Sequence, residues 1–314
     1  MLRYIVLLLS TLTSCFALAS ATHTTHVLTG HPATYAITTA LTQGTDIVVT
    51  LAAPRKLPAS RLYAYLTGRG HDKLIPLANA ADAVITLHSI WPEDPIYPHS
   101  RRANLRIVPI DAGQPLDEAL PGIALMEPDN DPSLYRQFQL EPMPANGEQS
   151  APWLSPTALG RMADITARDL SSLSPLEAPK IEENLALIKH ELMVQKAMTD
   201  QELANADSLV TLALGPHFGY LAADLGLELI GTLTASSREW DEKRLAQLSN
   251  WILEEEVAVV LMDSRFATEA ILHAIKLSGA QPAVLVDADA DTQTPTDWTG
   301  ENLTIISHAF TQIP

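Results

Sequence analysis

Short apolar runs, separated by stretches compatible with helices, recur along residues 26–112. Runs of this length suit buried strands, and their alternation with helical stretches is typical of βα units that share one parallel sheet. The pattern therefore predicts an N-terminal α/β lobe. Its expected strands are Val27-Leu28, Asp46–Leu51, Ala83–Leu87 and Leu105–Ile110.

The pattern changes in the middle of the chain. Residues 113–155 are rich in proline, acidic residues and asparagine, so we predict a long surface excursion. Ser155-Pro156 then suits the start of a helix, with the serine as N-cap and the proline in the first turn. Further along, apolar residues spaced for one face of a helix predict a buried stripe at Ile181, Leu185, Ile188 and Leu192.

Apolar runs and helical stretches alternate again from Leu209 onward. This second series predicts a C-terminal α/β lobe by the same argument as the first. Its expected strands are Leu209–Leu214, Val257–Leu261, Ala283–Val286 and Leu303–Ile306.

The first residues have the pattern of a secretory signal peptide, because Arg3 precedes the apolar run Ile5–Leu12 and Ala19-Ser20-Ala21 suits cleavage. The run is too short for a stable membrane span, and no later segment is apolar for long enough to be one. We therefore predict an exported, periplasmic protein. Its parts are a signal peptide at 1–21, an N-terminal α/β lobe at 22–155, a linking helical segment at 156–206 and a C-terminal α/β lobe at 207–314.

Cys15 is the only cysteine and lies inside this signal, so the mature chain has no internal disulfide. The run Leu12–Cys15 also resembles a bacterial lipobox, in which Cys15 would carry a lipid. Residues 16–21 would then be an unusually apolar start for a lipoprotein tether, whereas a cleavage site at Ala-Ser-Ala explains them directly. The soluble form is therefore favoured over lipid anchoring.

The chain of 314 residues has a formal net charge of −17. Removal of residues 1–21 takes away Arg3 and no acidic residue, which changes −17 to −18. Such a surface repels nucleic acid and anionic membranes, so we expect no nucleic-acid partner. It attracts cations only diffusely, and charge alone is no evidence for a metal site.

Two predicted strands of the C-terminal lobe end on side chains that bind metals. The run Leu209–Leu214 leads into a turn that carries His217, and the run that begins at Val257 ends on Asp263. In an open parallel sheet the carboxyl ends of the strands face one crevice, so these two side chains are expected to converge. They are suited to form half of a metal site. Asp287, after a third strand, belongs to an acidic run that we interpret as a solvated loop.

Several motifs spread over most of the mature chain carry a resemblance. The most specific are His217–Leu221, followed by Leu225-Gly226-Leu227, and Asp263–Phe266; others are His31–Tyr35, Ala81–Val84 and Trp153–Pro156. Through them the chain resembles the solute-binding proteins of zinc and manganese ABC transporters, the ZnuA/TroA-like family. The resemblance implies two α/β lobes bridged by a long helix, a metal bound between them, and a monomer that delivers the metal to an inner-membrane ABC permease.

The resemblance also implies ligands, but only in one lobe. His217 matches the histidine ligand of the family's C-terminal lobe, and Asp263 matches its carboxylate ligand. In the N-terminal lobe Ala59 and Ala151 stand where the family has histidines, and the family's histidine-rich acidic loop is absent.

Two ligands alone would leave a zinc ion weakly held, because a closed zinc site has four. His88 follows the run Ala83–Leu87 and His31 follows Val27-Leu28, so both are expected at carboxyl ends of strands. With His217 and Asp263 they would supply three imidazoles and one carboxylate, a set that suits zinc and is acceptable to manganese. The alternative for each histidine taken singly is a hydrogen-bonded turn residue.

Catalysis is the competing class of function, and its signals are missing. The mature chain has no Gly-x-Ser-x-Gly elbow, no His-Glu-x-x-His motif, no phosphate-binding loop and no cysteine, so we expect no enzyme. Two binding hypotheses remain. In one, the protein captures zinc, or less favourably manganese, for a permease. In the other, it is a divergent relative that binds a metal chelate, another small ligand or a partner protein.

Overall fold

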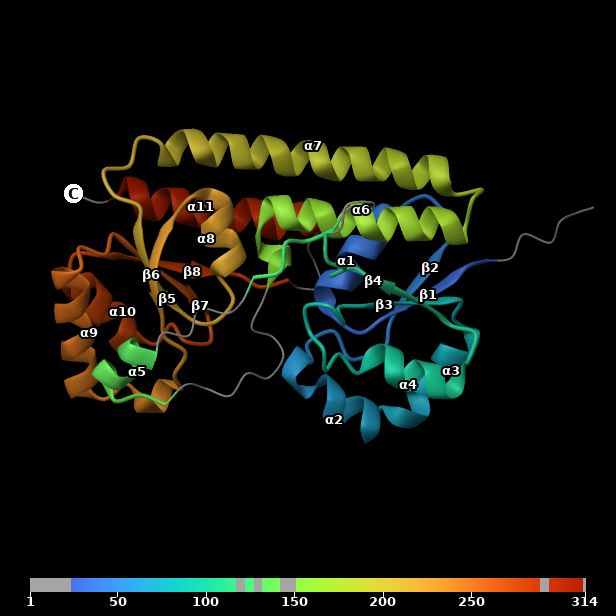
Figure 1. Cartoon of the computed structure of the whole chain (residues 1–314), viewed down its shortest axis with the longest axis horizontal. Helices are drawn as coiled ribbons and strands as arrows, with labels where there is room; N and C mark the ends of the chain where they lie inside the picture. The colour runs from blue at the N-terminus through green and yellow to red at the C-terminus, as the bar shows by residue number, and fades with distance from the viewer. Residues whose placement is uncertain (1–23, 117–121, 127–131, 142–150, 289–293, 313–314) are drawn as a thin grey trace, which may run out of the picture.

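The computed structural model describes residues 24–116, 122–126, 132–141, 151–288 and 294–312. They form two α/β lobes that lie side by side under a layer of long helices (Figure 1). Each lobe contains a parallel sheet, as the predicted fold class requires. The predicted signal peptide and Cys15 lie outside the described residues.

The N-terminal lobe is built on a parallel four-stranded sheet in the order β2-β1-β3-β4. The strands are β1 (His26–Thr29), β2 (Val48–Leu51), β3 (Ala83–Thr86) and β4 (Val108–Asp111), which confirms the four predicted runs. The helical elements are α1 (Pro32–Leu41), η1 (Ala59–Arg61), α2 (Leu62–Thr67), α3 (His71–Ala80) and α4 (Ile96–Ala103).

The C-terminal lobe repeats this topology, with a parallel four-stranded sheet in the order β6-β5-β7-β8. Its strands are β5 (Val210–Leu214), β6 (Glu228–Thr232), β7 (Val259–Asp263) and β8 (Gln281–Leu285). Its helical elements are α8 (Gly219–Leu225), η3 (Ser237–Glu239), α9 (Glu242–Glu254) and α10 (Glu269–Leu277).

One predicted strand is wrong and one observed strand was not predicted. The run Leu303–Ile306 lies inside α11 (Pro295–Thr311), which begins with a capping box formed by Thr294 and Asp297. A short apolar run has the same sequence pattern in a buried helix as in a buried strand, so the length of the element and its capping residues must distinguish the two. β6 was missed because Glu228 and Gly231 interrupt its apolar pattern.

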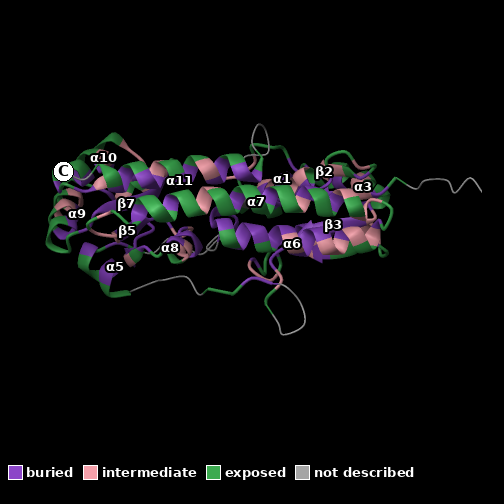
Figure 2. Cartoon of the chain, turned by 90° about the horizontal axis from the view of Figure 1, so that it is seen from above, coloured by how far each residue is buried: buried purple, intermediate pink, exposed green. Residues whose placement is uncertain are grey.

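Three long helices form the upper layer (Figures 1 and 2). They are α6 (Pro156–Leu173), α7 (Ala178–Leu203) and α11, and α7 packs against both of the others. Ser155 accepts a hydrogen bond from Ala158 N as the predicted N-cap of α6, with Pro156 in the first turn. The predicted stripe of α7 faces inward, with Ile181, Ile188 and Leu192 buried and Leu185 partly buried.

The excursion at 113–155 is more than a surface loop. Its helix α5 (Pro132–Phe138) packs against α9, and Leu134, Tyr135 and Phe138 belong to a core cluster of the C-terminal lobe. The Tyr135 hydroxyl accepts a hydrogen bond of 2.7 Å from Thr234 N. Helix α5 is therefore part of the core of the C-terminal lobe, although its segment follows the N-terminal lobe in the sequence. Farther along the chain, η2 (Pro152–Leu154) leads into α6.

Among the described helices, none combines the length and the apolar composition that a membrane span needs.

Candidate metal centre

The carboxyl ends of the strands carry the polar residues of the candidate site. His31 follows β1, His217 lies in the turn between β5 and α8, Asp263 is the last residue of β7, and Asp287 follows β8. β5 and β7 are neighbouring parallel strands, with Leu214 opposite Met262. The turn after β5 needs Gly215, whose φ of 144° is one that other residues rarely adopt. Parallel pairing thus brings His217 and Asp263 to one edge, as the strand ends predict.

His31 is a buried residue of the N-terminal lobe that faces the C-terminal lobe. Its ring centroid lies 4.5 Å from that of Trp153 and 6.5 Å from that of Trp91. Burial lowers the pKa of His31 to about 4; the charge of Asp287 opposes this shift, and the charge of His217 adds to it. The charges of Asp287 and His217 therefore reach His31 from the other lobe, so these three side chains share one interlobe region.

The structure gives His31 a second role, as the N-cap of α1. Its Nδ1 accepts a hydrogen bond of 3.1 Å from Ala33 N. An imidazole nitrogen that accepts carries no proton, so the neutral ring has its proton on Nε2. Ligation of a metal through Nε2 would move that proton to Nδ1, where it would face the Ala33 N–H. Metal binding by His31 through Nε2 therefore requires loss of the cap.

The buried imidazole of His31 predicts a pH-dependent stability. The unfolded chain protonates this residue near pH 6.5, but the folded chain does so only near pH 4. Between these values the unfolded state binds the extra proton, so stability is complete above pH 6.5 and falls as the pH falls towards 4, by roughly 1.4 kcal/mol per unit. We expect the metal-free protein to lose roughly 2 kcal/mol of unfolding free energy between about pH 7 and about pH 5 from this residue.

His31→Asn is the matched variant, because asparagine caps helices well and does not titrate in this range. Chemical denaturation of both proteins at the two pH values measures the difference. The variant should lose roughly 2 kcal/mol less than the wild type. Equal losses would show that His31 titrates normally in the folded protein.

In the C-terminal lobe, Arg265 joins Asp263 and His217. Arg265 Nη2 and Nε donate to Asp263 Oδ2 over 2.7 and 2.9 Å, and Arg265 N donates to Asp263 Oδ1 over 2.8 Å. The same Nη2 lies 3.3 Å from His217 Nε2. Burial alone raises the pKa of the Asp263 carboxyl, but the hydrogen bonds and charge of Arg265, with the charge of His217, hold that pKa below its ordinary value. Asp263 is therefore an anion with a guanidinium partner.

The remaining predicted ligand, His88, is exposed in the turn that follows β3. Across the part of the chain that the structure describes, no three side chains from histidine, cysteine, aspartate and glutamate are grouped to hold a metal ion. The four predicted ligands therefore do not form a closed shell.

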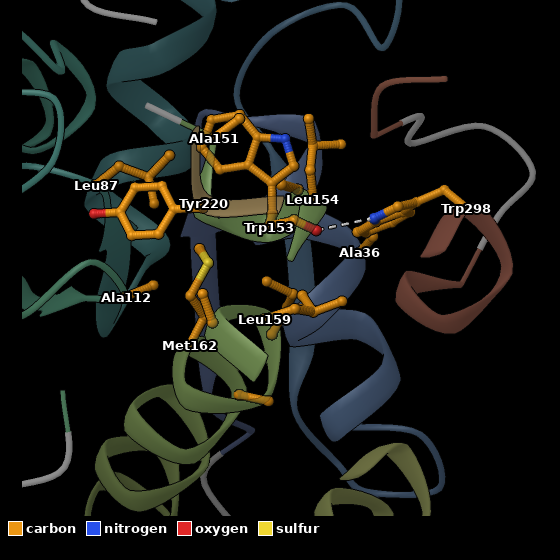
Figure 3. Close-up of a cluster of buried hydrophobic side chains, with 14 of the residues drawn as sticks. Ala36, Leu87, Ala112, Ala151, Trp153, Leu154, Leu159, Met162, Tyr220 and Trp298 are labelled. Atoms are coloured by element: carbon orange, nitrogen blue, oxygen red, sulfur yellow. Dashed lines mark hydrogen bonds between the residues drawn. The ribbon is translucent and has the colours of Figure 1, made fainter. Parts of the chain in front are cut away.

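Ala59 and Ala151, which stand where the family has the histidine ligands of its N-terminal lobe, lie in different structural environments. Ala59 begins η1, while Ala151 is 1% exposed and immediately precedes η2. Around Ala151 and Trp153, apolar side chains from both lobes and from α6 meet in one buried cluster (Figure 3). At Ala151 the chain thus has apolar packing in place of a ligand.

Two residues of this region have roles that their sequence context does not predict. Asp287 accepts a hydrogen bond of 3.0 Å from Trp153 Nε1, which ties β8 to η2, whereas the sequence suggested a solvated loop. Its position directly after an apolar run was the available signal, the same one that identified Asp263. Arg265 belongs to the motif Asp263–Phe266, but nothing in its spacing indicates that its side chain folds back onto both predicted ligands.

Comparisons with known proteins place this site in context. The family model for zinc-uptake complex component A, periplasmic (ZnuA), matches residues 117–309. No curated protein matches the chain.

Solved structures match over almost the whole chain. A crystal structure of ZnuA is 20% identical, with a TM-score of 0.64 over 91% of this chain and 99% of that one. A zinc-bound deletion mutant of ZnuA is 20% identical, with a TM-score of 0.64 over 92% and 99%. A manganese-bound variant of a periplasmic metal binding protein from Candidatus Liberibacter asiaticus is 16% identical, with a TM-score of 0.64 over 91% and 99%. At these identities the likeness is one of fold.

Proposed function

The chain belongs to the ZnuA family, the periplasmic zinc-uptake components, and on this premise we propose that it captures a divalent cation in the periplasm and delivers it to an inner-membrane ABC permease. Solute-binding proteins of this family are not enzymes, and we expect no catalysis. The protein would act as a monomer that loads and releases its cargo as the two lobes move.

The observation that carries the proposal is the pair of side chains at the ends of β5 and β7. His217 and Asp263 come from neighbouring parallel strands and contact the same guanidinium, through His217 Nε2 at 3.3 Å and Asp263 Oδ2 at 2.7 Å. Two groups that hold one cationic group between them are placed to share a metal ion. His31 approaches from the other lobe, close enough for its protonation to respond to His217.

Zinc is favoured over manganese because the proposed donors are mainly imidazoles. Histidine nitrogen and one carboxylate suit zinc, whereas manganese prefers sites rich in oxygen. Among the structural relatives, the ZnuA deletion mutant has zinc bound and the variant from Candidatus Liberibacter asiaticus has manganese bound, so the fold accommodates both ions.

A divergent function is the second candidate, and two observations favour it. Ala151 is packed in an apolar cluster where a ligand would stand, and Arg265 already neutralises Asp263. A protein with these features would bind a metal chelate, another small ligand or a partner protein in place of the bare ion. Titration with the bare ion separates the two candidates.

Calorimetric titration of the chelator-treated protein with zinc, and then manganese, tests the proposal. We expect one zinc ion to bind per chain with sub-micromolar affinity, and manganese to bind more weakly. His217→Ala and Asp263→Ala should each weaken zinc binding by more than about tenfold, because each removes a donor atom that the ion would contact.

His273→Ala is the matched control. His273 is exposed on α10 of the same lobe, so its removal takes away an imidazole without touching the site, and zinc affinity should be unchanged. Zinc binding that survives both His217→Ala and Asp263→Ala would rule out this site and favour the divergent function.

A further inference from the structure

Arg265 lies in the turn between β7 and α10, and its side chain folds back onto the strand end. The turn is closed by Phe266 N, which donates to Asp263 O over 2.9 Å. The guanidinium makes a two-nitrogen contact with Asp263 Oδ2, while the backbone N–H of Arg265 holds Oδ1. Both oxygens of this carboxylate are therefore engaged by the same residue.

The contact between Arg265 and His217 involves Nε2, one of the two ring nitrogens through which a histidine binds a metal. A guanidinium only donates hydrogen bonds, so a hydrogen bond between Arg265 Nη2 and His217 Nε2 uses the lone pair of Nε2. A zinc ion bound at Nε2 would need the same lone pair. One nitrogen cannot serve both partners, so metal and guanidinium exclude each other at His217.

From this geometry we infer that Arg265 sets the affinity of the site for cations: its guanidinium occupies the place of the cation between His217 and Asp263, and a divalent ion must displace it in order to bind. This inference rests on the proposed function, since it assumes that the cargo is a bare cation.

The exposure of the two side chains indicates which of them can move. The side chain of Arg265 is 50% exposed, whereas that of Asp263 is 11% exposed. Arg265 can therefore rotate into solvent while Asp263 stays in place. The bond from the backbone N of Arg265 to Asp263 Oδ1 does not use the Arg265 side chain and survives this rotation, so the turn keeps its shape and Oδ2 becomes available to the ion.

Displacement of the guanidinium sets a threshold for binding. Every cation loses the same amount of binding free energy when it breaks the arginine contacts, so ions with weak intrinsic affinity are excluded first. Manganese binds nitrogen and oxygen donors more weakly than zinc does. Arg265 would thus lower the affinity for both ions by the same factor and leave the ratio of their affinities unchanged, so that manganese, the weaker ligand, is the first to fall below the concentration at which it binds.

Arg265→Gln tests this role, because glutamine removes the charge and the planar fork. Titrated with zinc alone, the variant should bind roughly tenfold to hundredfold more tightly than the wild type, the range expected when hydrogen bonds to a charged group no longer have to be broken. Manganese alone should gain affinity by a similar factor. The matched control is Lys276→Gln, which removes an exposed positive charge from the last turn of α10, far along the helix from the site, and should leave both affinities unchanged.

A second measurement follows the guanidinium itself. The nitrogen-15 NMR signal of the Arg265 Nε–H group, assigned by its loss in Arg265→Gln, should shift or broaden as one equivalent of zinc is added to the wild type. A signal that stays unchanged while zinc binds would overturn the displacement.

The outcomes separate the two proposals. If wild type and Arg265→Gln bind zinc equally, or if the variant binds more weakly, the role of Arg265 is refuted while the capture function stands. If neither protein binds zinc or manganese, both are refuted. Binding by Arg265→Gln alone supports the role of Arg265 and shows that the wild-type site does not capture the bare ion.

Discussion

Replacement of Trp153 by alanine is expected to lower the free energy of unfolding by about 3–5 kcal/mol, the cost of removing a large buried aromatic side chain. Trp153 is 4% exposed. Its ring lies against that of His31, and its Nε1 donates to Asp287 in the other lobe. The loss should therefore weaken each lobe and also the junction between them. Chemical denaturation of wild type and variant measures it.

Two further variants show which part of Trp153 matters. Trp153→Phe keeps most of the buried ring but loses the N–H that Asp287 accepts, so we expect a cost of only about 1–2 kcal/mol. Leu105→Ala removes a side chain that is 74% exposed and should change stability by less than about 0.5 kcal/mol. If Trp153→Ala cost no more than Leu105→Ala, the junction would not be packed as described.

The second large effect is expected at Phe138, in α5. Phe138 is fully buried and lies edge-on to Trp240 and Trp251, with ring centroids 6.2 and 6.1 Å away. Phe138→Ala should lower the free energy of unfolding by about 3–5 kcal/mol, because it leaves a cavity between three aromatic rings. Near-ultraviolet circular dichroism, together with denaturation, should report both the lost packing of the tryptophans and the lost stability.

Leu116→Ala is the control from the same excursion, since Leu116 is 62% exposed and should cost less than about 0.5 kcal/mol. A similar small cost for Phe138→Ala would mean that α5 is peripheral to the C-terminal lobe. The contrast between the two sites thus tests whether residues 113–155 contribute to that core.

The elements that could be predicted are those whose own residues decide them. β1, β3, β5 and β7 are buried runs bounded by turns, and α6 has both an N-cap serine and a proline in its first turn. Where the local signal is ambiguous, packing decides. Leu303–Ile306 is helical because its capping box and its place against α7 make it part of α11. β6 forms because it lies beside β5, although its own pattern is weak.

The candidate site divides in the same way. His217 and Asp263 were identified because each lies at or just beyond the end of a predicted strand, and parallel strands bring their carboxyl ends to one edge. Arg265 was not recognised, because its role depends on where a flexible side chain turns. Asp287 was not recognised, because its role depends on a contact with Trp153, which is far away in the chain. His31 was correctly placed at a strand end, but its burial between Trp91 and Trp153 depends on segments far away in the chain.

By itself, the sequence determined the two α/β lobes, the helical segment between them and the strand ends that carry His217, Asp263 and His31. These follow from local periodicity, caps and turns, which act between residues that are close along the chain. Only the tertiary structure decided that α5 packs in the C-terminal lobe, that Trp153 joins the lobes through Asp287, and that Arg265 sits between the two predicted ligands. Such contacts link residues far apart in sequence, or depend on side-chain rotation, so no local pattern encodes them.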